Sequence, residues 1–415
     1  MRLLLVSDSY PPLIGGATRA TQILARDLSA RGHDVCVATS WQAGAPERET
    51  DDHGVRVRRL HGIVTRLHWL SADSFRRIPP PFPDPETTIR FARLIRRVRP
   101  DVIHCYGWMT YSCLLALFIA RSRIPLIVSA RDYGNVCALR TLLRQDEVCD
   151  GPAPVKCLTC ARHEYGLPKA ALAVGGVLGA RRPLARRATL VHSVSRYVDS
   201  VMRRELSSGR RSPAFAVVPD YRPGGETAEP DAAVLARLPS EPYILFVGAL
   251  RRVKGVEELI AAYELLDGDR PPLVLIGTRA PDSPTEFPDG VHVLRDVPYS
   301  TVLAAWDGAL FGVAPSTLPE PLGNVVHEAM SRGRPVIGTT PGGHADMITD
   351  GVTGRLVPPR DVTALAAAIQ ELVASPSTTE RMGTAAREAA RRFGADAVIP
   401  RLEALYIAAM EGERR

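Results

Sequence analysis

Lysine is almost absent from this 415-residue sequence. It stands only at Lys156, Lys169 and Lys254, so arginine supplies nearly all of the 52 basic residues. Arginine as the default basic residue is typical of a biased genome. The formal net charge of +7 therefore does not single out a polyanion, and we expect no nucleic acid partner. Each of the three lysines, by contrast, becomes a candidate functional residue.

Long apolar runs are also lacking. The apolar start is interrupted by Asp8, too early for a signal core, and the run at 114–128 contains Arg121 and Arg123, which are costly inside a bilayer. The sequence therefore predicts a cytoplasmic protein. The segment 167–187 is apolar in its middle and ends in four arginines. It is either a domain helix with a charged end or a peripheral contact with the inner face of a membrane.

The dinucleotide-binding fingerprint GxGxxG is missing as well, which argues against a nicotinamide cofactor. A glycine pair, Gly15 and Gly16, does follow the first predicted strand and precedes a helix. Such a pair lets backbone N–H groups approach a phosphate at the positive end of the helix. The alternative is that the two glycines only form the turn between the strand and the helix.

What the sequence does contain is an alternation of short β-branched runs and helical segments. The predicted strands are 2–7, 35–39, 55–60, 101–105, 124–129, and then 243–248, 273–277, 291–294, 308–314 and 335–338. This rhythm predicts two α/β domains with doubly wound, mostly parallel sheets. The segment 209–230, rich in Pro, Gly and Arg, is the natural junction, and the proline-rich stretch 71–86 is expected to be a surface loop.

Two segments of the second domain carry chemistry. Lys254 follows a predicted strand at the sheet edge where open α/β sheets bind ligands, and its ammonium suits a diphosphate oxygen. In the second segment Gly323 opens a helix, so the amides of Leu322, Gly323 and Asn324 can face a phosphate. Glu320 could then reach a sugar and Glu328 a ribose hydroxyl. The plainer alternatives are a solvated basic loop and a salt bridge from Glu328.

Four cysteines are grouped at Cys137, Cys149, Cys157 and Cys160, and the last two form a Cys-x-x-Cys pair. This grouping suggests a structural zinc site, with His163 as a substitute ligand. An iron–sulfur cluster, redox thiols and disulfides are the alternatives. Four ligands leave no open coordination position, so such a metal would not be catalytic.

Five elements stand in one order along the chain. They are Gly15-Gly16, Lys254-Gly255, Glu320 with Glu328, Gly342-Gly343 with Asp346, and DGVTGRLVPP from Asp350. In this pattern the sequence resembles the GT-B glycosyltransferases of the retaining family 4, over nearly the whole chain, and among them a subgroup with a Cys-rich segment in the first domain.

The resemblance implies two Rossmann-like domains facing across a cleft. Residues 1–215 would form the acceptor side, with the helix 395–415 crossing back to it, and 216–394 would bind the nucleotide sugar. The implied activity is metal-independent transfer of a sugar, with retention, from a nucleoside diphosphate sugar to a glycan, lipid-linked or small-molecule acceptor. Polysaccharide or glycoconjugate biosynthesis is the implied setting.

The resemblance also suggests roles for single residues. Lys254, with Arg251 or Arg252 and the helix amides, would stabilise the departing diphosphate. The loop around Val297 would read the base through its backbone, and we favour uridine. Two positions depart from the family: Ala249 replaces an arginine, and Arg131 stands where many members have a histidine that contacts the donor sugar.

His104 is a further candidate, either for contact with a sugar or for a structural role. Three functions remain possible for the protein. The first is the transferase, in which Arg131 contacts the donor sugar. The second is a hydrolase of the same donor, and the third is a catalytically degenerate protein that only binds the sugar nucleotide.

Overall fold

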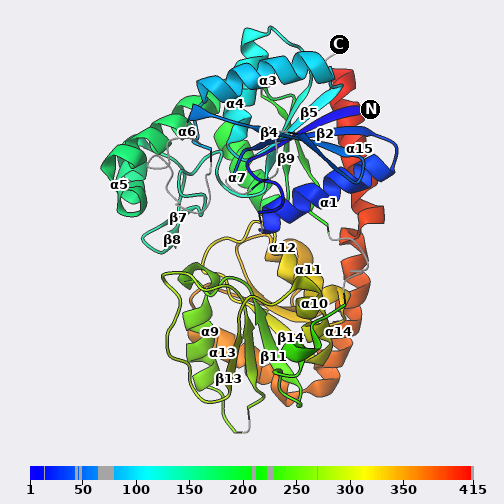
Figure 1. Cartoon of the computed structure of the whole chain (residues 1–415). Helices are drawn as coiled ribbons and strands as arrows, with labels where there is room; N and C mark the ends of the chain where they lie inside the picture. Colours follow the sequence, from blue (N-terminus) through cyan, green and yellow to red (C-terminus); the bar gives the residue numbers. More distant parts are fainter. Residues whose placement is uncertain are drawn as a thin grey trace. The chain divides into compact units, whose positions relative to one another are not determined.

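The structure is a computed structural model, and it describes residues 1–13, 15–42, 45, 49–63, 79–207, 212–221, 229–268 and 270–412. The chain forms two compact units (Figure 1). Unit 1 comprises Met1–Pro219 with Val398–Arg415, and unit 2 comprises Asp220–Ala397. Most of the predicted junction 209–230 and residues 71–78 of the predicted loop lie outside the described residues.

Unit 1 is built on an eight-stranded sheet in the order β10-β9-β6-β5-β1-β2-β4-β3. Every neighbouring pair is parallel except β3 with β4. The strands are β1 (Arg2–Ser7), β2 (Asp34–Ser40), β3 (Glu49–Asp52), β4 (Val55–Leu60), β5 (Val102–Tyr106), β6 (Leu126–Ala130), β9 (Leu190–Ser193) and β10 (Ala214–Val217). The central strands are buried along almost their whole length, as expected of a parallel sheet covered on both faces.

Apart from α15 (Ala395–Gly412), which ends the described chain and begins at the last residues of unit 2, the helices of unit 1 connect these strands. They are α1 (Gly16–Ala30), α3 (Pro85–Val98), α4 (Met109–Ile119), α5 (Pro154–Tyr165), α6 (Leu167–Arg187) and α7 (Arg196–Leu206). α3 packs against α4, α4 against α6, and α6 against α7. Right-handed crossovers place these four on one face of the sheet and α1 on the other.

One loop prediction is wrong at its end. The proline-rich stretch was expected to stay irregular to residue 86, but α3 begins at Pro85. Asp84 caps this helix by accepting the amide of Thr87, and Pro85 occupies the first turn, where its missing N–H costs nothing.

Unit 2 contains a six-stranded, fully parallel sheet in the order β13-β12-β11-β14-β15-β16. Its strands are β11 (Tyr243–Val247), β12 (Leu273–Ile276), β13 (Val291–Leu294), β14 (Ala309–Ala314), β15 (Val336–Thr339) and β16 (Gly354–Val357). Its α-helices are α8 (Ala232–Leu235), α9 (Val256–Glu264), α10 (Tyr299–Gly308), α11 (Asn324–Ser331), α12 (His344–Met347), α13 (Val362–Ala374) and α14 (Pro376–Ala390). Short 3₁₀ turns stand at Arg252–Lys254 and Arg391–Phe393.

The predicted α/β class with parallel sheets in two domains is confirmed. The sequence patterns missed β3, β9, β10 and β16, which have only four residues each, and the small antiparallel hairpin of β7 (Leu143–Arg144) and β8 (Glu147–Val148). Within the described ranges, no helix has the length and apolar character needed to cross a bilayer.

Candidate active site

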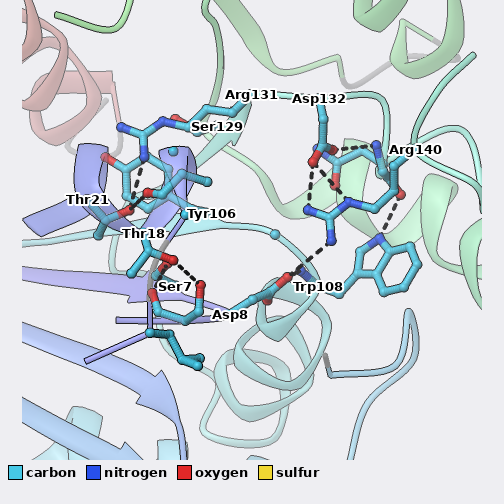
Figure 2. Close-up of a pocket in the computed structure, with 18 of the residues that line it drawn as sticks. Ser7, Asp8, Thr18, Thr21, Tyr106, Trp108, Ser129, Arg131, Asp132 and Arg140 are labelled. Atoms are coloured by element: carbon cyan, nitrogen blue, oxygen red, sulfur yellow. Dashed lines mark hydrogen bonds and ion pairs between the residues drawn. The ribbon is translucent and has the colours of Figure 1, made fainter. Parts of the chain in front are cut away.

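A cavity of about 260 Å³ opens at the carboxyl ends of β1, β5 and β6 in unit 1 (Figure 2). Loops that follow these strands and the first turn of α1 line it. The lining residues include Ser7, Asp8, Gly15, Gly16, Thr18, Thr21, Tyr106, Trp108, Ser129, Arg131, Asp132 and Arg140. Carboxyl ends of parallel strands are where open α/β sheets bind ligands.

Gly15 and Gly16 bring the amino end of α1 to this cavity. Gly15 is the N-cap residue and Gly16 the first residue of the helix, which has no side-chain cap and no acidic residue in its first turn. A Cβ atom added to Gly16 would meet nothing within 4 Å. Packing within the chain therefore does not require glycine at residue 16, and its missing side chain leaves the helix amides accessible from the cavity.

Arg131 also lines the cavity, directly after β6. Its Nη1 donates to Thr21 Oγ1 at 3.0 Å, and its guanidinium lies 4.1 Å from the centre of the Tyr106 ring. The stacked aromatic ring and the hydrogen bond fix the cation at the cavity wall (Figure 2).

A second cation, Arg140, lies between two carboxylates of the cavity (Figure 2). Its Nη2 is 2.6 Å from Asp132 Oδ2, and its Nη1 is 3.7 Å from Asp8 Oδ2. Asp8 also accepts the amides of Trp108 at 2.9 Å and Met109 at 2.8 Å. Burial raises the pKa of Asp8, although Arg140 and the two amides oppose this.

The sequence interpretation missed this Asp8–Arg140–Asp132 cluster. The one available signal was position: Asp8 and Asp132 each follow a buried strand at the ligand-binding edge. Nothing in the local sequence distinguishes Arg140, because the chain must fold back over Trp108 before its guanidinium reaches either acid.

His104 lies beneath the cavity and is only 2% exposed. Its Nδ1 is within hydrogen-bond distance of the hydroxyls of Tyr106 and Tyr406, and its Nε2 is 2.7 Å from Ser129 Oγ. Burial lowers the pKa of His104 well below its ordinary value. Of its two candidate roles, the structure supports the structural one.

In unit 2, Lys254 and Glu320 form an ion pair. Lys254 Nζ lies 2.8 Å from Glu320 Oε2, which also accepts the hydroxyl of Ser316 at 2.8 Å. Burial alone would raise the pKa of Glu320. The neighbouring Lys254, His344 and Ser316 outweigh burial, so the pKa is lowered and the carboxylate stays charged.

The loop that carries Glu320 packs on the Gly342-Gly343 turn. The amide of Gly343 donates to the carbonyl of Glu320 at 2.6 Å. A Cβ at Gly343 would stand 2.3 Å from the carbonyl oxygen of Pro321, and one at Gly323 would stand 2.5 Å from His344 Nε2. The Pro321 backbone therefore requires glycine at residue 343, and the His344 ring together with the left-handed backbone requires it at residue 323.

The same loop leads into α11. Gly323 is its N-cap residue in the left-handed conformation (φ 87°), Leu322 is buried, and Asn324 is the first helical residue. The helix has neither a side-chain cap nor an acidic residue in its first turn. Its first amides are thus left without a capping side chain, an arrangement that favours an anionic ligand.

Glu328 lies one turn further along α11 and is 6% exposed. The hydroxyl of Tyr299, at the start of α10, donates to its Oε1 at 3.0 Å. Glu328 is therefore a buried carboxylate whose orientation is set by a tyrosine hydroxyl. Tyr299 was not predicted as a site residue.

The other predicted residues of unit 2 contact different groups. The Arg251 guanidinium pairs with Asp282 at 3.1 Å, and Arg252 is 3.9 Å from Glu257, with both side chains about half exposed. Val297 is half-buried in the loop between β13 and α10.

The thiols of Cys137, Cys149 and Cys157 lie close enough to Cys160 to interact with it electrostatically, and the four-cysteine metal site stays a prediction. Across the described ranges, no three His, Cys, Asp or Glu side chains are arranged to hold a metal ion. The sulfur atoms instead contact nearby backbone: Cys149 contacts the Gly151 carbonyl, Cys160 the Leu143 carbonyl, and Cys157 the Ala153 amide. Burial raises the pKa of Cys160, and the neighbouring thiols of Cys137, Cys149 and Cys157 raise it further.

Comparisons with known proteins agree with this architecture. The sequence model described as "Glycosyl transferase 4-like domain" matches residues 15–219, and "Glycosyl transferases group 1" matches 229–389. A glycogen synthase of Mycobacterium tuberculosis is 29% identical over 100% of this chain and 96% of its own length.

Two solved structures show the same fold. Sucrose-phosphate synthase from Thermosynechococcus elongatus has a TM-score of 0.73 at 21% identity, covering 98% of this chain and 99% of that one. Anabaena HepE in complex with UDP-glucose has a TM-score of 0.66 at 17% identity, covering 98% and 100%. Two parallel α/β units with these matches define a glycosyltransferase of the GT-B fold. The chain belongs to glycosyltransferase family 4.

Proposed function

We propose that the protein is a retaining transferase that moves a sugar from a nucleoside diphosphate sugar to an acceptor. The observation that carries the proposal is the Lys254–Glu320 pair at 2.8 Å, next along the chain to the uncapped amino end of α11. A cation and free helix amides suit a diphosphate, and a carboxylate suits sugar hydroxyls. UDP-sugar is the favoured donor, supported by the UDP-glucose bound to HepE.

Unit 2 would bind the donor. Lys254 would bind a diphosphate oxygen, and the amides of Leu322, Gly323 and Asn324 the other phosphate oxygens. Glu328, which is buried and oriented by Tyr299, would accept a hydrogen bond from a ribose hydroxyl. The exposed Arg252 and Arg251 would close over the phosphates only if Arg251 leaves its partner acid. Val297 would contact the base through its backbone.

Unit 1 would bind the acceptor in the cavity that follows β1, β5 and β6. Its wall contains two arginines and two carboxylates, a set that suits a hydroxyl-rich molecule such as a glycan or a glycosylated small molecule or lipid. Gly15 and Gly16 would let the transferred sugar approach α1, and Arg131 would contact it. This arrangement fits polysaccharide or glycoconjugate biosynthesis.

The chemistry of such a transfer requires no side-chain base. The bond from the anomeric carbon to the diphosphate oxygen breaks, and a new bond to the acceptor oxygen forms on the same face. The acceptor proton passes to the departing phosphate oxygen. Negative charge grows on the diphosphate, and the Lys254 ammonium with the α11 amides would stabilise it without a divalent metal.

A thermal-shift screen of nucleotide diphosphates and their sugars tests the donor site, on wild type, Lys254→Ala and Glu328→Ala. Lys169→Ala and the exposed Glu380→Ala are the matched controls. We expect a selective shift with UDP and its sugars that both site variants lose and both controls keep. No shift with any nucleotide would contradict the donor site.

Turnover then separates the three functions. Release of UDP that depends on an added acceptor, with an α-linked product from an α-linked donor, supports the retaining transferase. Release of UDP with water alone indicates a donor hydrolase, and binding without release indicates a degenerate binding protein. Unchanged turnover after treatment with a chelator supports metal independence.

A further inference from the structure

Arginines are concentrated at the amino-terminal edge of the unit 1 sheet. The segments 93–99, 118–125 and 179–189 contain ten arginines and no Asp or Glu. α3, α4 and α6 end within or beside these segments, just before β5, β6 and β9. Since these strands are parallel neighbours, the segments lie beside one another along the same edge.

Only part of this charge is used within the fold. Arg181 pairs with Glu205, and Arg187 donates to the carbonyls of Ser122 and Ile124. The other eight are exposed and form no ion pair with the part of the chain that the structure describes. Six of them lie in the last turn of α3 or α6 or in the residues that directly follow α3 and α4, and we call these six the arginine edge: Arg96, Arg97, Arg99, Arg121, Arg123 and Arg186.

At the rest of the amino-terminal ends of this sheet, the arginines are paired with acids. There Arg2, the first residue of β1, pairs with Asp101, just before β5, at 2.8 Å, and Arg56 on β4 pairs with Asp34 on β2 at 2.6 Å. Arginine is the default basic residue throughout the chain, so its presence alone carries no meaning. The three arginine-rich segments contain no acid, and Asp101, which follows the first of them, already pairs with Arg2, so the positive charge there is local.

Apolar side chains are exposed within the arginine edge. Phe118 is 76% exposed and Ile119 is 61% exposed, both in the last turn of α4. Arginines at helix ends are explained by the helix dipole, but two exposed apolar side chains are not. Apolar groups flanked by guanidinium groups match a bilayer surface, which offers hydrocarbon below a layer of phosphates. A nucleic acid offers phosphates but no apolar layer for Ile119.

We propose that this edge of unit 1 docks on a bilayer that contains anionic lipid. Phe118 and Ile119 enter the boundary between head groups and acyl chains, and the arginine edge binds lipid phosphates. The surface is separate from the proposed reaction, because the unit 1 cavity follows the opposite, carboxyl ends of the same strands. A docked protein would present that cavity to the aqueous side.

Flotation of the full chain with vesicles tests the proposal. We expect binding to phosphatidylcholine vesicles that contain phosphatidylglycerol, weakened by high salt, and no binding to phosphatidylcholine alone. Arg121→Gln with Arg123→Gln should lower the partition coefficient about 30-fold, the equivalent of about 1 kcal/mol for each charge. Phe118→Ser with Ile119→Ser should lower it about tenfold or more.

Two matched pairs in unit 2 serve as controls. Arg381→Gln with Arg387→Gln removes the same charge from exposed positions of α14. Leu265→Ser with Val352→Ser removes apolar side chains that are 58% and 49% exposed. Both controls should bind vesicles as the wild type does. If the apolar variant fails to fold by circular dichroism, the arginine variant decides.

Three results would overturn the proposal. One is equal binding to both kinds of vesicle, and another is an equal loss in the site and control variants. The third is no flotation combined with another interaction of the same surface. Duplex RNA binding that the arginine variant abolishes would mean that the surface binds a nucleic acid. Self-association that the apolar variant abolishes would mean that it binds a second copy of the chain.

Discussion

The two units differ in how far apart in sequence their polar site residues stand. In unit 2, Glu320 and Glu328 lie in one segment, and only Lys254 comes from elsewhere. In unit 1, the Asp8–Arg140–Asp132 cluster comes from two loops far apart in the chain. In unit 2, one loop and the helix that follows it contain most of the site residues, which are therefore close in sequence. In unit 1, the cavity is lined by loops after several strands, so its residues come together only when the chain folds. Sequence motifs therefore identify the first kind of site and miss the second.

The units also differ in charge. The unit 2 pair has one cation for one carboxylate, whereas Arg140 in unit 1 stands between two carboxylates. Removal of the cation should thus affect chemistry most in unit 2 and stability most in unit 1. The predictions below test this contrast.

The largest expected effect is on turnover in Lys254→Met. We expect kcat/KM for the donor to fall about 10²- to 10³-fold, because a preorganised charge on the leaving diphosphate is lost. Steady-state release of UDP measures it, with Lys169→Met as the control.

Glu320 would remain buried without its partner in this variant. Lys254→Met combined with Glu320→Gln should recover stability, because no uncompensated charge is left, but not activity. Recovery of activity in the double variant would show that the pair is purely structural.

The next effect is on stability in Arg140→Met. We expect the free energy of unfolding to fall by about 3 kcal/mol, near the low end for a broken buried pair because the Arg140 side chain is 28% exposed. Denaturant unfolding measures it, and Arg144→Met, an exposed arginine nearby, is the control.

The same variant separates the two units functionally. The KM for the acceptor should rise while the thermal shift produced by UDP stays unchanged. A loss of UDP binding in Arg140→Met would contradict the assignment of the acceptor to unit 1.

Much of the fold was predictable from the sequence, because buried parallel strands appear as continuous apolar runs. The strands predicted at 2–7, 55–60 and 291–294 have the bounds of β1, β4 and β13. β9 and β16 were missed because each has only two apolar residues in its four, whereas β13, which is equally short, has three. The cysteine spacing did not indicate that Cys157 and Cys160 lie on a helix, α5, where Cys157 contacts the Ala153 amide and Cys160 the Leu143 carbonyl of β7.

The site residues were predictable only where they lie close together in the sequence. The motif around Glu320 and Glu328 indicated both carboxylates, but not the tyrosine that holds Glu328 or the serine that holds Glu320. Tyr299 comes from another element, α10, and reaches Glu328 only through packing, whereas Ser316 precedes Glu320 in the same loop but belongs to no recognisable pattern.

A smaller effect should appear with pH. Burial lowers the pKa of His344 to about 4 from its ordinary 6.5. The unfolded chain therefore binds a proton that the folded chain refuses, and stability is lost as the pH falls below 6.5. The loss from this group amounts to about 2 kcal/mol at pH 5.

His344→Asn isolates this contribution, because the asparagine oxygen can accept the Thr339 amide in place of Nδ1. Stability measured by urea unfolding should fall less steeply between pH 6.5 and pH 5 in the variant. Parallel slopes for variant and wild type would mean that His344 does not carry the effect.

The smallest effect concerns Tyr299, the unit 2 contact that no motif indicated. Its hydroxyl donates to Glu328 at 3.0 Å, and Tyr299→Phe removes one hydrogen bond to a charged group, about 1.5 kcal/mol. The donor KM should rise roughly tenfold with kcat unchanged, since the bond orients a carboxylate that binds the donor equally in ground and transition states. Tyr263→Phe, which removes a hydroxyl bonded to the Pro271 carbonyl, is the matched control. Tighter donor binding in Tyr299→Phe would instead mean that the hydroxyl competes with the ribose for Glu328. The unit 2 site, like that of unit 1, would then depend on a contact between residues far apart in the sequence.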